Sequence, residues 1–222
     1  MRIFRRHVLI AAAAMLSVCA CSPAGLAQEQ NASPAPPPGN EGASTPPQRA
    51  VLYEEDPNNP NGRRSTGAVI WRTEAIPAGA GDSPGIAIRA DIQIPERRMA
   101  VGWSLRRNTE QALPASHTVE MMFRLPADFP GGGISSVPGI VMKQADQPNG
   151  TPLAGVPVKV STDFFMIGLS DAEVQRNVAL LKEWPYLDVL IVYGSGRRAV
   201  LALEKGATGE RAFAAAFAAW GM

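Results

Sequence analysis

Cysteine is almost absent from this sequence of 222 residues, and the two positions that carry it are informative. Cys19 and Cys21 both lie near the N-terminus, and no cysteine follows them. A folded domain beyond Cys21 therefore contains no disulfide, no cysteine metal ligand and no thiol nucleophile. The stability of such a domain must come from its core.

Histidine is equally scarce, since the sequence contains only His7 and His117. One histidine beyond the N-terminal segment leaves little room for metal sites, general bases or catalytic triads. By strand alternation His117 shares a face with Val119 and Met121, which favours a structural role. A triad would need a serine and an acid brought to His117 by the fold, and Ser195, between two glycines, indicates a hairpin turn.

A strong excess of one charge is also missing. The full sequence has 21 basic and 20 acidic residues, and three of the basic ones, Arg2, Arg5 and Arg6, stand at the N-terminus. The rest of the chain is therefore slightly acidic. That balance excludes nucleic acid as a partner, because domains that bind nucleic acid carry basic patches.

The first 20 residues have the composition of an export signal. They contain no acidic residue, and residues 8–20 are apolar, as in a secretory signal peptide. Two cleavage sites remain open. Residues 18–21 (VCAC) approximate a lipobox with Cys21 as the lipid attachment site, and cleavage before Cys21 predicts a lipoprotein on the inner or outer membrane. Cleavage after Ala27 instead predicts a soluble periplasmic or secreted protein.

Proline dominates the stretch after this signal. Residues 28–50 contain six prolines and no large apolar side chain, so they cannot bury enough surface to offset the entropy lost on ordering. Residues 21–50 are predicted to be a disordered, extended tether. Residues 51–222 remain for a single β-rich domain with a core of its own.

Period-two alternation recurs through the predicted domain. Residues 86–94 are the clearest case, because their isoleucines share one face while Arg89, Asp91 and Gln93 share the other. The pattern predicts antiparallel strands. Further strands are expected at residues 51–55, 68–73, 99–105, 119–125 and 140–143, with two more within 156–169.

Residues 56–62 (DPNNPNG) predict a loop between the first two strands. The spacing of aspartate and asparagine imitates a calcium-binding loop only in part. Pro60 and Asn61 stand where a ligand and the required glycine would be. A structural turn is therefore predicted.

The C-terminal third changes to a helical period. Residues 170–173 (SDAE) match a capping box ahead of a helix that ends before Pro185. A hairpin with strands at residues 188–193 and 198–204 follows, and Thr208 is expected to cap a last helix with a buried aromatic face. The predicted fold class is mainly β (α+β), an antiparallel β-sandwich-like domain with one inserted helix and a C-terminal helix.

Several stretches carry a resemblance, namely residues 125–132 (LPADFPGG), 139–143 (GIVMK) and 209–213 (GERAF). With the helix and hairpin between them they resemble uncharacterised exported proteins of alphaproteobacteria. The order of elements from about Ser116 is more distantly similar to the invasion-associated locus B family, small secreted or periplasmic β-rich proteins linked to host-cell entry. That family usually has a cysteine pair before the first of these helices, where residues 158–164 (VKVSTDF) have none. The resemblance therefore implies fold and compartment, and no site residue is carried over.

Paired arginines are the one distribution that suggests a binding surface. Pairs occur at residues 63–64, 97–98, 106–107 and 197–198, at predicted strand ends or turns. If several converge, their guanidinium groups could bind anionic lipid, peptidoglycan or another acidic glycan. The candidate contacts are Arg97, Arg98, Arg106 and Arg107. The simpler interpretation is that these arginines solvate strand ends and block sheet edges.

No catalytic constellation stands out in the sequence. Glu54 and Glu55 are neighbours whose side chains point to opposite sides of a strand, although carboxylates distant in sequence could still meet. The sequence thus predicts an exported, non-catalytic interaction domain with no metal and no cofactor. Its expected partner is an unknown envelope component or protein. The alternative is a periplasmic hydrolase that acts on envelope glycans or esters.

Overall fold

The computed structural model describes residues 46–77, 85–110 and 112–222. Within these residues one antiparallel sheet of eleven strands is accompanied by two α-helices. The mainly β fold class with an inserted and a C-terminal helix is therefore confirmed. The predicted signal peptide, Cys21 and most of the predicted tether lie outside the described residues. No helix among the described residues is both long and apolar enough to cross a membrane.

The elements follow one another along the chain with these bounds: β1 (Gln48–Asp56), β2 (Asn59–Ile76), β3 (Gly85–Ile94), the 3-10 helix η1 (Pro95–Arg97), β4 (Met99–Arg107), β5 (Ala115–Arg124), β6 (Ile134–Lys143), β7 (Thr151–Pro152), β8 (Gly155–Lys159), β9 (Phe164–Ser170), α1 (Val174–Glu183), β10 (Tyr186–Tyr193), β11 (Arg198–Glu204) and α2 (Gly206–Ala219).

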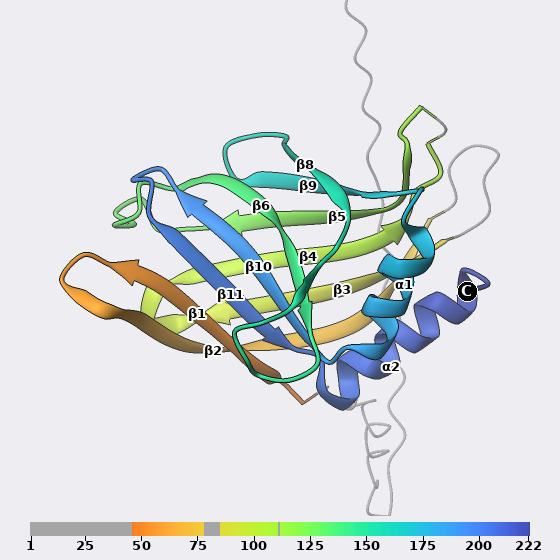
Figure 1. Cartoon of the computed structure of the whole chain (residues 1–222), viewed down its shortest axis with the longest axis horizontal. Coiled ribbons are helices and arrows are strands. Elements are labelled where there is room, and N and C mark those ends of the chain that lie inside the picture. The colour runs from red at the N-terminus through yellow and green to blue at the C-terminus, as the bar shows by residue number, and fades with distance from the viewer. Residues whose placement is uncertain (1–45, 78–84, 111) are drawn as a thin grey trace, which may run out of the picture. The chain divides into compact units, whose positions relative to one another are not determined.

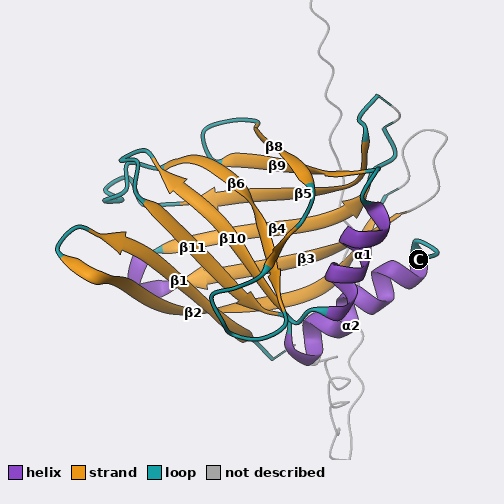
Figure 2. Cartoon of the chain, in the orientation of Figure 1, coloured by secondary structure: helices purple, strands orange, loops and turns teal. Residues whose placement is uncertain are grey.

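The strand order in the sheet is β7-β6-β10-β11-β1-β2-β3-β4-β5-β9-β8. The sheet curls, so that β6, β10 and β11 cross in front of β3, β4 and β5 (Figure 1). The sandwich-like arrangement expected from the sequence is thus made by two halves of one continuous sheet around a shared core. Strands β6 and β8 approach each other without pairing. Both helices lie together at one end of the sheet (Figure 2).

Strand alternation decides which residues enter the core. In β3, Ile88, Ile92 and Ile94 are buried, whereas Asp91 is exposed on the opposite face. The same period places Val119 and Met121 of β5 inside. Apolar side chains that alternate in this way cover one face of a half-buried strand. The alternation predicted for residues 86–94 is confirmed.

The last helix, α2, packs against β2 and β3 with the aromatic face that the sequence predicted. Phe213, Phe217 and Trp220 are all buried. Gly209 allows the close approach, because a Cβ atom there would lie 2.8 Å from Lys205 Cβ and 3.1 Å from Trp71 Cδ1. The aromatic stripe is therefore core.

Several strand boundaries differ from the expectation, and strand β5 begins at Ala115, four residues early. Strand β1 begins at Gln48, inside the predicted tether, because Ala50 is fully buried and pairs with Leu203 of β11. Strand β2 begins at Asn59, within the predicted loop, since Asn59 pairs across the hairpin with Asp56. Strand β6 begins at Ile134, six residues early, and a bulge against β10 accommodates its irregular part.

Both predicted helix caps are wrong. Ser170 is the last residue of β9, and α1 begins at Val174 with no side-chain cap on Glu173. Helix α2 already begins at Gly206, so Thr208 lies inside it and is buried. At both helices the local capping signal is overridden by the packing of the preceding strand.

Candidate functional site

The inside of the curled sheet is filled by aromatic side chains. The ring centroids of Trp71 and Trp103 lie 5.4 Å apart in an edge-on contact, and Phe213 of α2 lies 5.4 Å from Trp71. The Trp71 Nε1–H group donates a hydrogen bond to the Glu204 carbonyl at 2.9 Å. Aromatic contacts of this geometry stabilise a packed core. The sites available to a partner therefore lie on the outer surface.

His117 is part of this core. Its side chain is 1% exposed, and its ring centroid lies 5.0 Å from that of Trp220 and 6.1 Å from that of Phe217. Burial, followed by the nearby charge of Arg107, lowers the pKa of His117 to about 4. The Nδ1 atom lies 3.1 Å from Ser116 Oγ, but a substrate would have no access to either nitrogen. The geometry supports the structural role.

One catalytic pattern was missed in the sequence. Residues 81–85 (GDSPG) match G-x-S-x-G, the nucleophile pattern of α/β-hydrolases. That pattern works only at a turn from a strand into a helix, whereas Gly85 here opens strand β3. Ser83 itself lies outside the described residues. The element that follows thus does not provide the context that this nucleophile requires.

A buried polar group links β1, η1 and β10. Arg97 Nη2 donates a hydrogen bond to Glu54 Oε1 at 3.0 Å, and Arg97 Nε lies 2.9 Å from Glu54 Oε2. The Tyr193 hydroxyl donates to Glu54 Oε1 at 2.8 Å. The Arg97 guanidinium also lies 4.9 Å from the centroid of the Phe129 ring. Burial, and then the negative charge of Glu54, raise the pKa of Tyr193. The charges of Glu54 and Arg97 are thus paired with each other in the interior of the domain.

Two further buried charges have structural partners. Lys143 Nζ lies 2.5 Å from Asp188 Oδ2 between adjacent strands β6 and β10, and burial raises the pKa of Asp188 despite this contact. Lys205 Nζ donates to the Leu181 carbonyl at 2.6 Å and lies 4.4 Å from the Phe213 ring centroid. Burial lowers the pKa of Lys205 to about 8. Lys205 therefore joins the end of α1 to the start of α2.

The arginines predicted as anionic-surface contacts do not converge. Arg97 and Arg98 precede β4, and Arg106 and Arg107 end it. Seven strand residues, 99–105, lie between Arg98 and Arg106, and the eight steps from one arginine to the other correspond to about 26 Å at ~3.3 Å per residue. The two pairs therefore lie at opposite ends of the sheet.

These four arginines are also occupied by contacts within the chain. Arg97 is buried against Glu54, as described above. Arg98 Nη2 binds Asp128 at 2.6 Å, Arg106 Nη2 binds Glu120 at 2.5 Å, and Arg107 Nη1 donates to the Trp220 carbonyl at 3.0 Å. The geometry favours the simpler interpretation, in which the arginines hold strand ends and turns.

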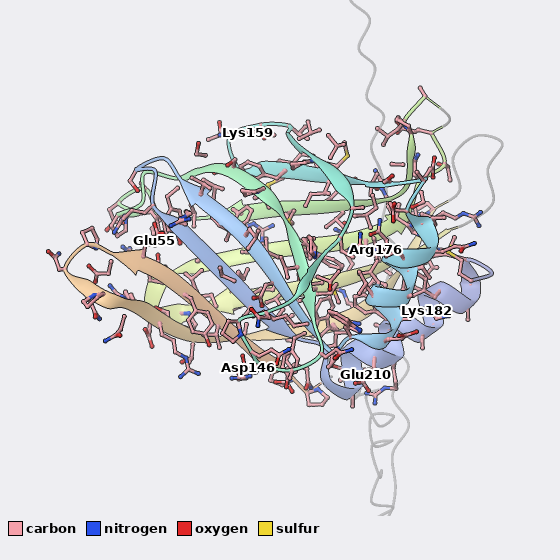
Figure 3. The ribbon with its side chains drawn as sticks, viewed as in Figure 1. Glu55, Asp146, Lys159, Arg176, Lys182 and Glu210 are labelled. Atoms are coloured by element: carbon pink, nitrogen blue, oxygen red, sulfur yellow. The ribbon has the colours of Figure 1, made fainter. Side chains whose placement is uncertain are left out.

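A groove of about 780 Å³ lies on the outer surface, between the tip of the β1–β2 hairpin and strands β10 and β11. Its apolar part is formed by Tyr53, Pro138, Leu190, Val192 and Val200. We call it the hairpin groove. Figure 3 shows Glu55 near the end of the sheet where β10 turns into β11.

Charged side chains border the hairpin groove. Glu55 Oε1 receives Arg198 Nε at 2.6 Å, and Glu55 Oε2 receives the Arg198 backbone N–H at 2.8 Å. Arg63 also lines the groove, and the Arg64 guanidinium lies 6.0 Å from the Tyr53 ring centroid. Among the described residues, Arg63 and Arg64 form no ion pair. The groove thus combines an apolar wall with two available positive charges.

The outer surface of β5, β9 and β8 is unusually apolar. Register pairs Met122 with Phe164, Val158 with Met166 and Val156 with Gly168, so that these side chains share the face opposite the core. Val156 is 68% exposed, Val158 45%, Val160 50% and Met122 43%. We call this surface the valine face; its members are Met122, Val156, Val158, Val160, Phe164 and Met166.

The valine face carries four of the seven large hydrophobic residues that are exposed within the described ranges. Glu120, Arg106 and Arg124 lie beside it on the same outer face of β4 and β5. A hollow around Gly102 adjoins it and is lined in part by Met122, Phe164 and Arg124. An apolar surface patch bordered by charged side chains is typical of an interaction site.

Backbone pairing at the free edge of β8 is blocked. Val160 N–H donates to the Phe164 carbonyl and Ser170 N–H donates to the Ala154 carbonyl, so the alternate residues, including Pro157 and Lys159, turn their backbone groups away from β9. Pro157 has no N–H to offer there. Lys159 Nζ instead reaches β6 and donates to the Ile134 carbonyl at 3.0 Å (Figure 3). A partner can therefore contact the side chains of the valine face, but it cannot pair with the backbone at the edge of β8.

The comparisons with known proteins give no relative from which a role could be transferred. Scans against protein-family models, curated proteins and solved structures find no significant match. Within the described residues, no group of three or more histidine, cysteine, aspartate or glutamate side chains is arranged to hold a metal ion.

Proposed function

We propose that this chain is an exported, non-catalytic interaction domain of the cell envelope, and that the valine face binds an envelope protein. The exposed row of Val156, Val158 and Val160 carries the proposal. Burying these side chains against an apolar partner surface is worth about 25 cal/mol for each Å² removed from water. The buried charges of Arg97 and Glu54 and of Lys143 and Asp188 are paired with each other inside the domain, which favours the surface as the place for function.

The chemistry around the valine face favours a protein over an anionic membrane. Arg106 and Glu120 form an ion pair in which Arg106 Nη2 lies 2.5 Å from Glu120 Oε1. Arg124 lies two residues beyond Met122 on the same face of β5. Acidic lipid would favour a basic border, whereas mixed charges around an apolar centre are usual at protein interfaces. The proposed partner is therefore a protein with an apolar surface of similar size.

Export is the second part of the proposal and rests on the sequence. The arginines and apolar run of the first 20 residues support a signal peptide. A lipid on Cys21 would hold the domain at a membrane by residues 21–45, and cleavage after Ala27 would release it. Either location gives the domain access to envelope proteins. The resemblance to the invasion-associated locus B family supports the same compartment.

A photo-crosslinking amino acid at position 158 tests the proposed surface in living cells. The matched control places it at Thr66, which is exposed on the outer face of β2. We expect a discrete adduct with another envelope protein from position 158 only, and Val158→Asp should abolish binding of that purified protein while Thr66→Asp should not.

Equal adducts from both positions would contradict the proposed surface. An adduct with twice the mass of this chain would show that the chain binds a second copy of itself, and it would overturn the proposal of a different protein as partner. The intact mass of the membrane-fraction protein, with Cys21→Ser as control, tests the anchor separately.

A further inference from the structure

The hairpin groove differs from the valine face in place and in chemistry. At the groove, one row of residues on the outer face crosses five neighbouring strands (Figure 1), namely Arg64 of β2, Tyr53 of β1, Val200 of β11, Leu190 of β10 and Gly139 of β6. The row begins with a positive charge, continues over apolar side chains and ends at a residue without a side chain. We propose that the hairpin groove binds a long-chain carboxylate, with its head group at Arg63 and Arg64 and its hydrocarbon chain along this row.

The apolar part of the row has the length of a fatty-acid chain. Neighbouring strands lie ~4.8 Å apart, so Tyr53 and Gly139, which are three strands apart, are separated by about 14 Å. Carbon–carbon bonds of about 1.5 Å advance an extended chain by roughly 1.3 Å each, so a chain of about twelve carbons covers this distance. The groove volume of about 780 Å³ lies within the range of about 300–1,000 Å³ that is usual for small-molecule sites. The ligand therefore fits as a single chain.

The groove favours a hydrocarbon chain over a peptide. Strands β1, β10 and β11 each pair with a neighbour on both sides, so their backbone groups are used within the sheet. A peptide that lay across these strands would contact side chains only, and its own backbone groups would find few partners in the protein. A hydrocarbon chain has no such groups. Tyr53 is 38% exposed, and Leu190, Val192 and Val200 are partly exposed beside it, so the apolar wall is accessible.

Two guanidinium groups supply the charge that a carboxylate head group requires. Arg63 lines the groove, and the Arg64 guanidinium lies 6.0 Å from the centroid of the Tyr53 ring. Neither arginine forms an ion pair among the described residues. A guanidinium and a carboxylate form paired, charge-assisted hydrogen bonds. The positive end of the row is therefore the place for the head group.

The other charged side chains of the groove already have partners within the chain, and these are Glu54 with Arg97, Glu55 with Arg198, Arg197 with the Pro130 carbonyl, and Asp56 with the Asn58 backbone N–H. A ligand would have to break these contacts to use them. Arg63 and Arg64 require no such exchange. The domain would thus carry a single fatty acid at a site separate from its protein-binding surface.

The test titrates the full chain with dodecanoate, below the concentration at which micelles form, and follows the methyl NMR signals of Leu190, Val192 and Val200. We expect these signals to shift and to saturate. Octanoate should bind at least about tenfold more weakly, because each buried methylene contributes a factor of roughly two to four to the affinity. Dodecyl maltoside has the same chain and no charge, and it should bind at least about tenfold more weakly, since hydrogen bonds to a charged group are lost.

Two variants test the two ends of the row. Arg63→Gln/Arg64→Gln should weaken dodecanoate binding at least about tenfold and leave dodecyl maltoside binding unchanged. The matched control Arg124→Gln/Arg176→Gln removes the same charge elsewhere and should bind as the wild type does. Gly139→Leu should weaken the binding of dodecanoate but not of octanoate, because the shorter chain ends before this position. The added Cβ would meet no atom within 4 Å, so the substitution blocks the row without straining the sheet.

Several results would overturn the proposal. These are no binding of dodecanoate, equal affinities for dodecanoate and dodecyl maltoside, or dodecanoate binding that is unchanged in Gly139→Leu. Tighter binding of dodecyl phosphate than of dodecanoate would overturn the carboxylate in favour of a phosphate head group. Val158→Asp should leave dodecanoate binding unchanged, so this proposal and that of the valine face can each fail alone.

Discussion

The ion pair between Glu54 and Arg97 provides a strong test of how the domain is held together. In the Arg97→Met variant the Glu54 carboxylate loses both guanidinium contacts, of 2.9 and 3.0 Å, and keeps only the Tyr193 hydroxyl at 2.8 Å. The side chains of Arg97 and Glu54 are only 9% and 6% exposed, so water cannot replace the lost partner. Removing one member of such a buried pair lowers the free energy of unfolding by about 3–5 kcal/mol.

The effect is measured by urea unfolding at pH 7, followed by the fluorescence of the buried Trp71 and Trp103. Arg98→Met is the matched control, because Arg98 is the next residue and its pair with Asp128 is 66% and 71% exposed. An ion pair so exposed contributes little. We expect a large loss of stability from Arg97→Met and no clear change from Arg98→Met.

A double variant separates the burial of charge from the loss of packing. Glu54→Leu/Arg97→Met removes both charges and leaves only the Tyr193 hydroxyl without its acceptor, a loss of about 1–3 kcal/mol. The double variant should therefore be more stable than Arg97→Met alone. If Arg97→Met were no more harmful than Arg98→Met, or if the double variant were less stable than the single one, the reasoning would be refuted.

Two other buried groups give predictions that depend on pH. The pKa of His117 is about 4 in the folded domain and about 6.5 in an unfolded chain. Between these pH values the unfolded state binds more protons than the folded state. About 3 kcal/mol of the free energy of unfolding is therefore lost as the pH falls from 6.5 to 4. His117→Phe should flatten that part of the urea-midpoint profile, and an unchanged profile would contradict the assignment. The pKa of Lys205 is lowered to about 8, so the unfolded state binds more protons than the folded state above that pH. The stability of the wild type should therefore rise from pH 8 to 9.5 relative to that of Lys205→Met. Stability profiles of the two proteins that run parallel over this pH range would contradict the burial of a charged amine.

The sequence predicts the strands of this fold better than their ends. Alternation is strong in β3 because its isoleucines form a complete row on one face. Asn59, Pro60 and Gly62 resemble loop residues, yet they belong to β2 because the hairpin continues through them beyond the rest of the sheet. Ser170 and Thr208 have the chemistry of helix caps but are held by β9 and by the buried face of α2. Capping is a local preference of about 1 kcal/mol, and tertiary packing outweighs it.

The buried polar contacts illustrate a second limit. Glu54 has the same parity as Leu52 in β1, so alternation alone places a carboxylate inside and implies a buried partner. Nothing local identifies that partner as Arg97, which lies 43 residues further along the chain. Pairing of this kind depends on which strands become neighbours. The residues that meet in the interior therefore become clear only once the strand order is known.

The valine face could also have been recognised in the sequence, since Val156, Val158 and Val160 alternate with Gly155, Pro157 and Lys159. An exposed row of valines at a sheet edge is a hazard, because free backbone groups invite uncontrolled strand pairing. Here Pro157 removes a donor from that edge and Lys159 occupies the space toward β6. Both devices block the backbone while they leave the valine side chains accessible. A strand that merely lacked protection would show neither device, so the combination favours a surface that binds a partner through side chains.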